Sequence, residues 1–273
     1  MPRVALSILG IAQPGRDLAS ALDGGGLEIR TAVDLPLGSG LGTSSILAAA
    51  VVRALAATFG LDFTNQELSD RVMVLEQRMT TGGGWQDQAG GIFPGAKLIS
   101  SGPGVRQRIR VQPLTWSPER QAEFSERMVL YYTGIRRIAK GLLNQVVGSY
   151  LAREVSTVQV LHSIKTLAVE MAYALQEGEW DYAGQLLNRH WKLNKVLDPH
   201  TTNAPINALL DLAAPHISGA KLAGAGGGGF LILLAHDPDA AAKLRGLLST
   251  LTGPARLYQY KIANDGLRIT NAR

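Results

Sequence analysis

The feature that most constrains the fold of this chain is a glycine-rich stretch between a β-like segment and a helix-like segment. Residues 27–33 favour a strand, residues 38–42 hold three glycines, and residues 45–59 have the alanine, leucine and valine content of a helix. Glycine permits the positive φ angles of a tight turn, and the N-terminus of a helix attracts anions. The order of strand, glycine loop and helix therefore predicts a phosphate-binding loop.

The side chains around these glycines support the same interpretation. A proline precedes them and fixes the path into the turn, while three hydroxyl residues follow and can reach a phosphate or Mg²⁺. The loop lacks the Gly-Lys-Ser/Thr end of a Walker loop and the acidic ribose ligand of a dinucleotide site. We expect the nucleotide contacts to come from the whole stretch, namely Pro36, Gly38, Ser39, Gly40, Leu41, Gly42, Thr43, Ser44 and Ser45.

A second dense glycine island, residues 224–229, precedes an apolar segment at 230–234 that reads as a strand. A run of four glycines in an otherwise compact chain indicates backbone that packs where no Cβ would fit. A flexible hinge is the alternative at this point.

Two carboxylates follow the phosphate loop at positions that suit phosphoryl transfer. That reaction needs a bound metal, aligned phosphates and a carboxylate that orients the attacking hydroxyl. Glu76 lies on a predicted helix over residues 65–79, and Asp87 lies in a polar, glycine-flanked turn at 82–91, so the two can converge. The alternatives are a solvated Glu76 beside Arg78 and a loop-capping Asx turn at Asp87.

The remaining pattern predicts mixed α and β structure in two parts, residues 1–125 and 126–273. Thr64 and Glu67 make a capping box for the helix at 65–79. A largely helical block is expected over 138–214 and a helix over 238–248. Further strands are expected at 97–100, 105–111, 128–133, 257–262 and 267–270.

Composition excludes several classes of protein. Hydrophobic residues make up 46% and charged residues 18%, as in ordinary globular proteins, and the absence of cysteine excludes disulfides and thiolate chemistry. The excess of five positive charges is scattered, which suits a nucleotide ligand better than nucleic acid. The apolar run at residues 4–12 is too short to span a membrane and is expected to form a buried helix. We expect a cytoplasmic protein without nucleic-acid or membrane partners.

As whole strings, these motifs resemble the GHMP kinases. Pro-x-x-x-Gly-Leu-Gly-Ser/Thr-Ser is the ATP loop of that family, and residues 36–47 look like its fucokinase version, as does Gly-Gly-Gly-Trp-Gln-Asp-Gln at 82–88. Residues 221–230 look like the third family motif. The resemblance implies an α+β GHMP kinase fold, with an incomplete N-terminal ribosomal-S5-like α/β domain and a C-terminal ferredoxin-like α+β domain.

The resemblance also implies a reaction and roles for residues. The cofactors would be ATP and Mg²⁺, and the substrate L-fucose, phosphorylated at its anomeric hydroxyl. Asp87 would be the catalytic base, Glu76 with Thr43 or Ser44 the Mg²⁺ ligands, and Gly224, Gly226 and Gly227 the loop that closes the nucleotide site. A heptose-phosphate kinase and a catalytically inactive nucleotide-binding fragment are the alternatives.

One family feature has no counterpart before Leu27. It is the opening motif, Pro-Val-Arg-x-Asp-Leu-Ala-Gly-Gly-Trp-x-Asp, which supplies a basic residue beside the catalytic aspartate. We therefore expect weaker catalysis, or an N-terminal partner segment or domain that completes the site. The guanylyltransferase domain fused to many fucokinases also has no counterpart, so no nucleotidyl transfer is expected.

Overall fold

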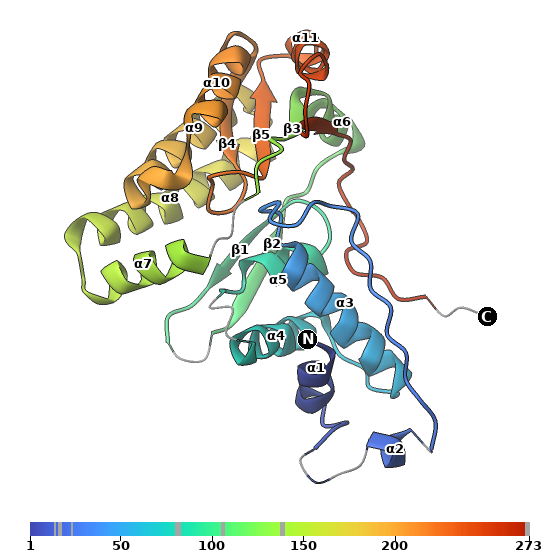
Figure 1. Ribbon diagram of the computed structural model, residues 1–273. Coiled ribbons are helices and arrows are strands. Elements are labelled where there is room, and N and C mark those ends of the chain that lie inside the picture. The colour runs from blue at the N-terminus through green and yellow to red at the C-terminus, as the bar shows by residue number, and fades with distance from the viewer. Residues whose placement is uncertain are drawn as a thin grey trace.

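A computed structural model describes residues 1–13, 15, 18–22, 24–79, 83–104, 107–136 and 140–270. Figure 1 shows two parts, one built from the first half of the chain and the other from the second. The first part holds the helices α1 (Pro2–Ile8), α2 (Leu18–Ala21), α3 (Thr43–Thr58), α4 (Asn65–Arg78) and α5 (Gln86–Ile92), and the antiparallel strands β1 (Lys97–Ser101) and β2 (Ile109–Pro113).

The second part is a four-stranded antiparallel sheet with helices around it. Its strands are β3 (Met128–Tyr132), β4 (Ile217–Leu222), β5 (Phe230–Ala235) and β6 (Arg256–Tyr258), in the spatial order β4-β5-β3-β6. Its helices are α6 (Pro118–Arg127), α7 (Lys140–Leu151), α8 (Val155–Glu177), α9 (Trp180–Leu197), α10 (Ala204–Ala213) and α11 (Pro238–Ser249), with short 3-10 turns at Pro199–Thr201 and Ala214–His216.

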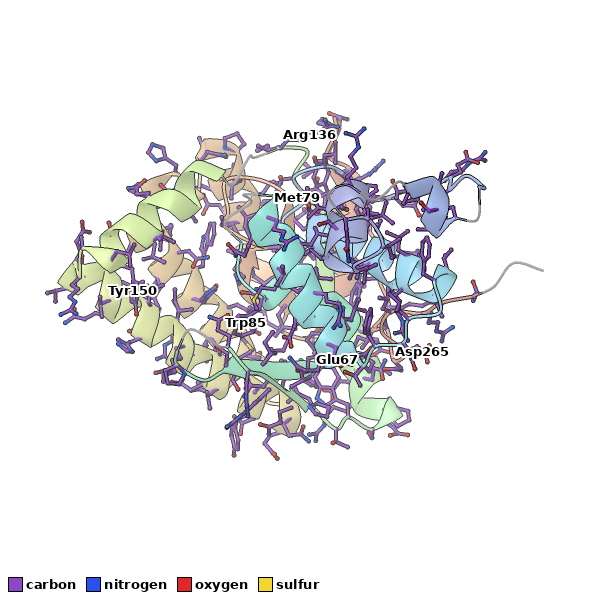
Figure 2. The ribbon with its side chains drawn as sticks, turned by 90° about the horizontal axis from the view of Figure 1, so that it is seen from below. Glu67, Met79, Trp85, Arg136, Tyr150 and Asp265 are labelled. Atoms are coloured by element: carbon purple, nitrogen blue, oxygen red, sulfur yellow. The ribbon has the colours of Figure 1, made fainter. Side chains whose placement is uncertain are left out.

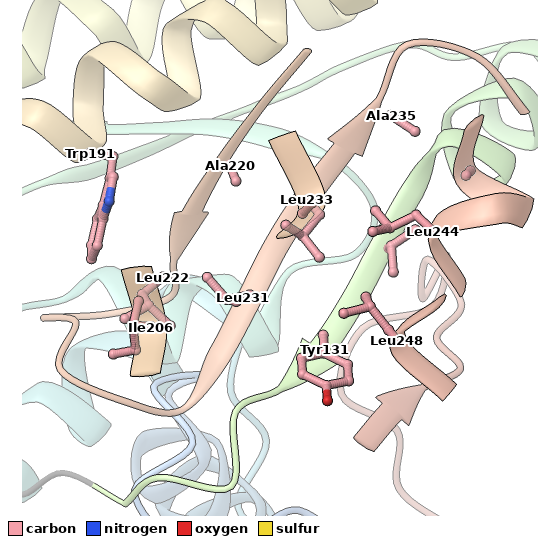
Figure 3. Close-up of a cluster of buried hydrophobic side chains, with 13 residues drawn as sticks. Tyr131, Trp191, Ile206, Ala220, Leu222, Leu231, Leu233, Ala235, Leu244 and Leu248 are labelled. Carbon is pink, nitrogen blue, oxygen red and sulfur yellow. The ribbon is translucent and has the colours of Figure 1, made fainter. Parts of the chain in front are cut away.

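The two faces of this sheet have different neighbours, because side chains alternate along each strand. One face carries the core shown in Figure 3, where residues such as Leu231 and Leu233 pack against α10 and α11. On the opposite face, Leu234 packs against α8 and α9 at one end. At the other end, Tyr132 and Phe230 pack against the loop that precedes α3. The sheet thus supports the glycine loop directly.

The first part has its own core, in which apolar residues of α1, α3 and α4 pack together. The buried N-terminal helix expected from the sequence is confirmed by α1, whose Ala5 and Leu6 are buried. The C-terminal segment returns to this part: the Gly95 N–H donates to the Ala263 carbonyl at 2.7 Å, and the Leu267 N–H donates to that of Ile92 at 3.3 Å. The division at residues 125 and 126 stays a prediction; it falls within α6.

Most expected elements form, and the differences have physical causes. The capping box is confirmed, with the Glu67 N–H donating to Thr64 Oγ1 and the Thr64 N–H donating to the Glu67 carboxylate. The expected strands at 27–33 and 267–270 are wrong within the described ranges, where neither segment pairs with another strand. A strand needs a neighbour to satisfy its backbone groups, and composition does not supply one.

Candidate active site

The glycine loop before α3 has the geometry that the sequence predicts. Gly38, Gly40 and Gly42 have φ angles of +73°, +78° and +68°, in the left-handed region that favours glycine. Gly42 is the N-cap residue of α3 and has no side chain to bond the N–H groups of the first turn. By contrast, Thr64 closes the N-terminus of α4. The start of α3 can therefore offer its N–H groups to an anion.

Asp87 lies directly beside this helix N-terminus. It is in the first turn of α5, so the expectation of a polar turn at this position is corrected to a short helix. Helix α5 crosses α3 closely: a Cβ added at Gly91 would lie 2.5 Å from Ile46 Cγ1. A Cβ added at Gly42 would lie 2.7 Å from Asp87 Cβ and 2.8 Å from its Cγ. The glycine at the helix start thus leaves the space that the aspartate fills.

Glu76 joins the same site from α4. It is buried, with 6% of its surface exposed, and Ser45 Oγ donates to its Oε1 at 2.5 Å. The alternative of a solvated helix residue is therefore wrong. The other two hydroxyl residues lie differently, with Thr43 half-buried and Ser44 exposed. Of these three hydroxyl residues, Ser45 is thus the one seen to donate a hydrogen bond to Glu76, the candidate metal ligand.

The two carboxyl groups influence each other. Burial raises the pKa of Glu76, the Ser45 hydrogen bond opposes this, and the negative charge of Asp87 raises the pKa further. Asp87 is exposed at the surface, yet the protein atoms packed around its carboxyl displace enough water to raise its pKa as well. Two partly desolvated carboxylates with repelling charges form a place where a cation is favoured.

Such a pair suits Mg²⁺ that arrives with a nucleotide. Mg²⁺ in phosphoryl-transfer sites is held by one or two carboxylates together with substrate phosphates. Within the described ranges, no group of three or more His, Asp or Glu side chains forms a metal cage. The carboxylate pair therefore suits a cation that is also coordinated by phosphate oxygens of a nucleotide.

The second glycine island packs against the first. A Cβ at Gly40 would lie 2.7 Å from the Ala223 carbonyl oxygen, and a Cβ at Gly224 would lie 3.1 Å from that of Gly40. The Phe230 N–H donates to the Ser39 carbonyl at 3.1 Å. This backbone contact confirms close packing as the reason for the glycines and rules out a free hinge.

Two threonines fix the far side of this island. The Thr133 N–H and its Oγ1 both donate to the Gly229 carbonyl at 2.9 Å. The Gly227 N–H donates to the Thr201 carbonyl at 2.5 Å, and Thr201 Oγ1 donates to the Ala225 carbonyl at 3.0 Å. The sequence does not predict this role for the two threonines, because it depends on which loops the fold brings together.

Trp85 lies two residues before Asp87 in the chain. In Figure 2, α4 lies between the labels of Glu67, in its first turn, and Met79, its C-cap residue, and in that view Trp85 is drawn to one side of the helix. Trp85 is half-buried and immediately precedes α5, so it stays a candidate wall for a sugar. Arg136 is exposed.

None of the helices in the described ranges combines the length and apolar character needed to cross a bilayer.

Comparisons with known proteins show which families and relatives this chain resembles. Residues 8–95 match the GHMP kinases N terminal domain and residues 171–249 the GHMP kinases C terminal domain. The chain is 42% identical over 241 residues to a bifunctional fucokinase/GDP-fucose pyrophosphorylase of Arabidopsis thaliana, covering 88% of this chain and 22% of that protein. It is 37% identical over 285 residues to an L-fucokinase/L-fucose-1-P guanylyltransferase of Bacteroides fragilis, covering 100% of this chain and 30% of that protein.

Among solved structures, phosphomevalonate kinase of Streptococcus pneumoniae, in complex with phosphomevalonate and AMPPNP, superposes with a TM-score of 0.69 at 17% identity. That match covers 96% of this chain and 80% of the other. The expected fold class is thereby confirmed. The chain spans less than a third of the length of the two curated relatives described above.

Proposed function

The chain belongs to the GHMP kinase family, and on that premise we propose that it transfers the terminal phosphoryl group of ATP to the anomeric hydroxyl of L-fucose, giving fucose 1-phosphate. The observation that carries the proposal is the placement of Asp87 against Gly42, at the N-terminus of α3. The similarity to two fucokinases over most of the chain supports the choice of sugar.

The glycine loop binds the phosphates in this proposal. The N–H groups at the start of α3 and along residues 38–42 donate to phosphate oxygens, with Pro36, Ser39, Leu41, Thr43, Ser44 and Ser45 completing the contact. The positive φ angles of the three glycines keep this backbone concave. Gly224 supports this backbone through its contact with Gly40, while Gly226 and Gly227 of the same island pack against Thr201 and close the nucleotide site.

Asp87 carries the proton transfer. Its carboxylate accepts the proton of the anomeric hydroxyl as the sugar oxygen bonds to the γ-phosphorus, and the bond from that phosphorus to the bridging oxygen of ADP breaks. The raised pKa of Asp87 makes its carboxylate a stronger base than an ordinary aspartate.

Glu76 has a different task. With Thr43 or Ser44 it would hold Mg²⁺, which, when bound, supplies positive charge to the phosphate oxygens. The hydrogen bond from Ser45 Oγ fixes the orientation of the Glu76 carboxylate. The rise in pKa that Asp87 imposes on Glu76 would be relieved by the cation.

The test is ADP release from Mg·ATP in the presence of L-fucose, heptose phosphates or mevalonate, run beside direct measurement of ATP binding. We expect release that depends on fucose, its loss in Asp87→Asn with ATP binding kept, and normal activity in the exposed α10 variant Asp211→Asn. Release that depends on a heptose phosphate would move the proposal to that substrate. Tight ATP binding without turnover on any sugar would contradict a kinase function.

A further inference from the structure

A lysine on β4 faces the same side of the sheet as the phosphate loop. Ala220 and Leu222 point into the core beneath α10 and α11, so Lys221 between them points to the opposite face. Its partner across the ladder is Ile232, which packs on the cluster of Tyr132, Ala223 and Phe230. That cluster also contacts Leu35 and Leu41 of the loop.

The position of Lys221 along the strand brings it near the loop. Ala223 follows Lys221 by two residues, just after the end of β4, and so continues the same face of the sheet. Its carbonyl oxygen lies next to Gly40, where an added Cβ would be 2.7 Å away from it. Two residues of strand span about 7 Å, a distance that the flexible four-carbon stem of lysine can cover. The ammonium group of Lys221 can thus approach a ligand held by the glycine loop.

Lys221 is half-buried, and in the described part of the chain its ammonium makes neither a hydrogen bond nor an ion pair. Burial alone lowers its pKa to about 8. Lys221 also influences His190 of α9, whose pKa is lowered to about 4 by burial and by the positive charge of Lys221. At neutral pH the lysine is therefore mostly charged and the histidine neutral.

A partly buried cation that lacks a partner loses hydration without compensation, and such groups concentrate at functional sites. Lys97 offers a comparison within the same chain. It is also partly buried, but its Nζ donates to the carbonyls of Gly90, Phe93 and Gly95 at 2.9, 2.6 and 3.0 Å. The hydrogen bonds of Lys97 are thus satisfied by the fold, whereas Lys221 has no such partners among the residues that the structure describes.

We propose that the ammonium of Lys221 binds a phosphoryl group that lies beyond the β-phosphate of the nucleotide, on the sugar side of the site. The proposal rests on the proposed kinase function. The bound phosphoryl group can be one of two: the terminal phosphoryl of ATP, or a phosphate that the sugar already carries. In either case the bound anion pairs with the buried charge and favours its protonated form.

The experiment measures binding rather than turnover, using Lys221→Met, Lys221→Arg and the control Lys243→Met, an exposed lysine of α11. The probes are ADP, the ATP analogue AMPPNP, a heptose and its 7-phosphate. A lost charge-assisted hydrogen bond weakens binding by about 10- to 100-fold. We expect Lys221→Met to weaken AMPPNP but not ADP if the source is ATP, or the heptose 7-phosphate but not the heptose if the source is the sugar. Lys221→Arg should keep most of the affinity.

A stability measurement separates this role from a structural one. Because it removes a partly buried charge that has no partner in the described part of the chain, Lys221→Met should melt no lower than the wild-type protein, and the pKa of His190 measured by NMR should rise. Equal weakening of ADP and AMPPNP, or unchanged binding of every probe, would overturn the proposal. Failure of the wild-type chain to bind any nucleotide would instead refute the kinase function itself.

Discussion

The contact between Gly42 and Asp87 gives the sharpest prediction, because the same helix contains a matched control. Gly42 at the start of α3 and Gly60 just after its end have φ angles of +68° and +66°. A Cβ at Gly60 would meet nothing within 4 Å, whereas a Cβ at Gly42 would lie 2.7 Å from Asp87 Cβ. Replacing each glycine by alanine therefore separates backbone strain from displacement of the aspartate.

The magnitudes follow from these two observations. The left-handed conformation costs alanine about 1–2 kcal/mol, so both variants should lose about that much stability. Carbon atoms in contact prefer a separation of about 3.5–4.0 Å, so Asp87 must move by about 1 Å in Gly42→Ala. A misplacement of about 1 Å at a catalytic group costs about 100-fold in rate.

The assays are thermal unfolding by circular dichroism and fucose-dependent ADP release at saturating substrates. We expect both variants to show this backbone loss of stability, with a further loss in Gly42→Ala because Asp87 must shift, and a fall in kcat of about 100-fold for Gly42→Ala alone. The same kcat for Gly42→Ala and Gly60→Ala would refute the reasoning, because it would mean that the position of Asp87 against the loop does not govern the reaction.

Three further changes test other parts of the account. Thr133→Val removes both the hydroxyl bond to the Gly229 carbonyl and the bond that this hydroxyl accepts from the Ile135 N–H, but keeps the bond from its own N–H. Urea denaturation should therefore show a loss of about 1–3 kcal/mol, and an unchanged free energy of unfolding would contradict this role. Lys97→Met removes three hydrogen bonds to carbonyls around the end of α5 and should lower the free energy of unfolding by about 1–3 kcal/mol. An unchanged melting temperature would contradict a stabilising role for these bonds. Glu76 and Asp87 have folded-state pKa values above their ordinary 4.5 and 3.8, so the folded state holds these two protons more tightly than the unfolded state does. The free energy of unfolding therefore falls as the pH rises from the ordinary pKa values through the raised ones. Asp87→Asn should therefore stabilise the protein relative to wild type more at pH 7 than at pH 4, as measured by melting temperature, and a larger gain at pH 4 would reverse the assigned sign.

The sequence predicts the parts of the site that depend on local chemistry. Three glycines with positive φ, a helix that begins at Thr43 and a capping box at Thr64 are each determined by residues close together in the chain. The strings around Asp87 and Gly224 were also sufficient to predict the fold class through resemblance. The prediction of a turn around Asp87 was wrong, because the glycines in this segment disfavour a helix by composition although a short helix forms there.

Other parts depend on contacts between distant segments. Strand β4 has the sequence Ile-Ser-Gly-Ala-Lys-Leu, which has little strand character of its own, and forms because it pairs with β5. Ser45 meets Glu76 across 31 residues of sequence, and Thr133 meets Gly229 across 96. Conversely, residues 27–33 have β composition without a pairing strand in the described ranges.

The measurement that tests the central claim most directly is identification of the product by ³¹P NMR after incubation with Mg·ATP and L-fucose. The account predicts a phosphomonoester signal coupled to the anomeric proton of fucose, formed by the wild-type chain and lost in Asp87→Asn while ATP binding remains. No fucose-dependent product from a chain that binds ATP, or an equal yield from Asp87→Asn, would contradict it.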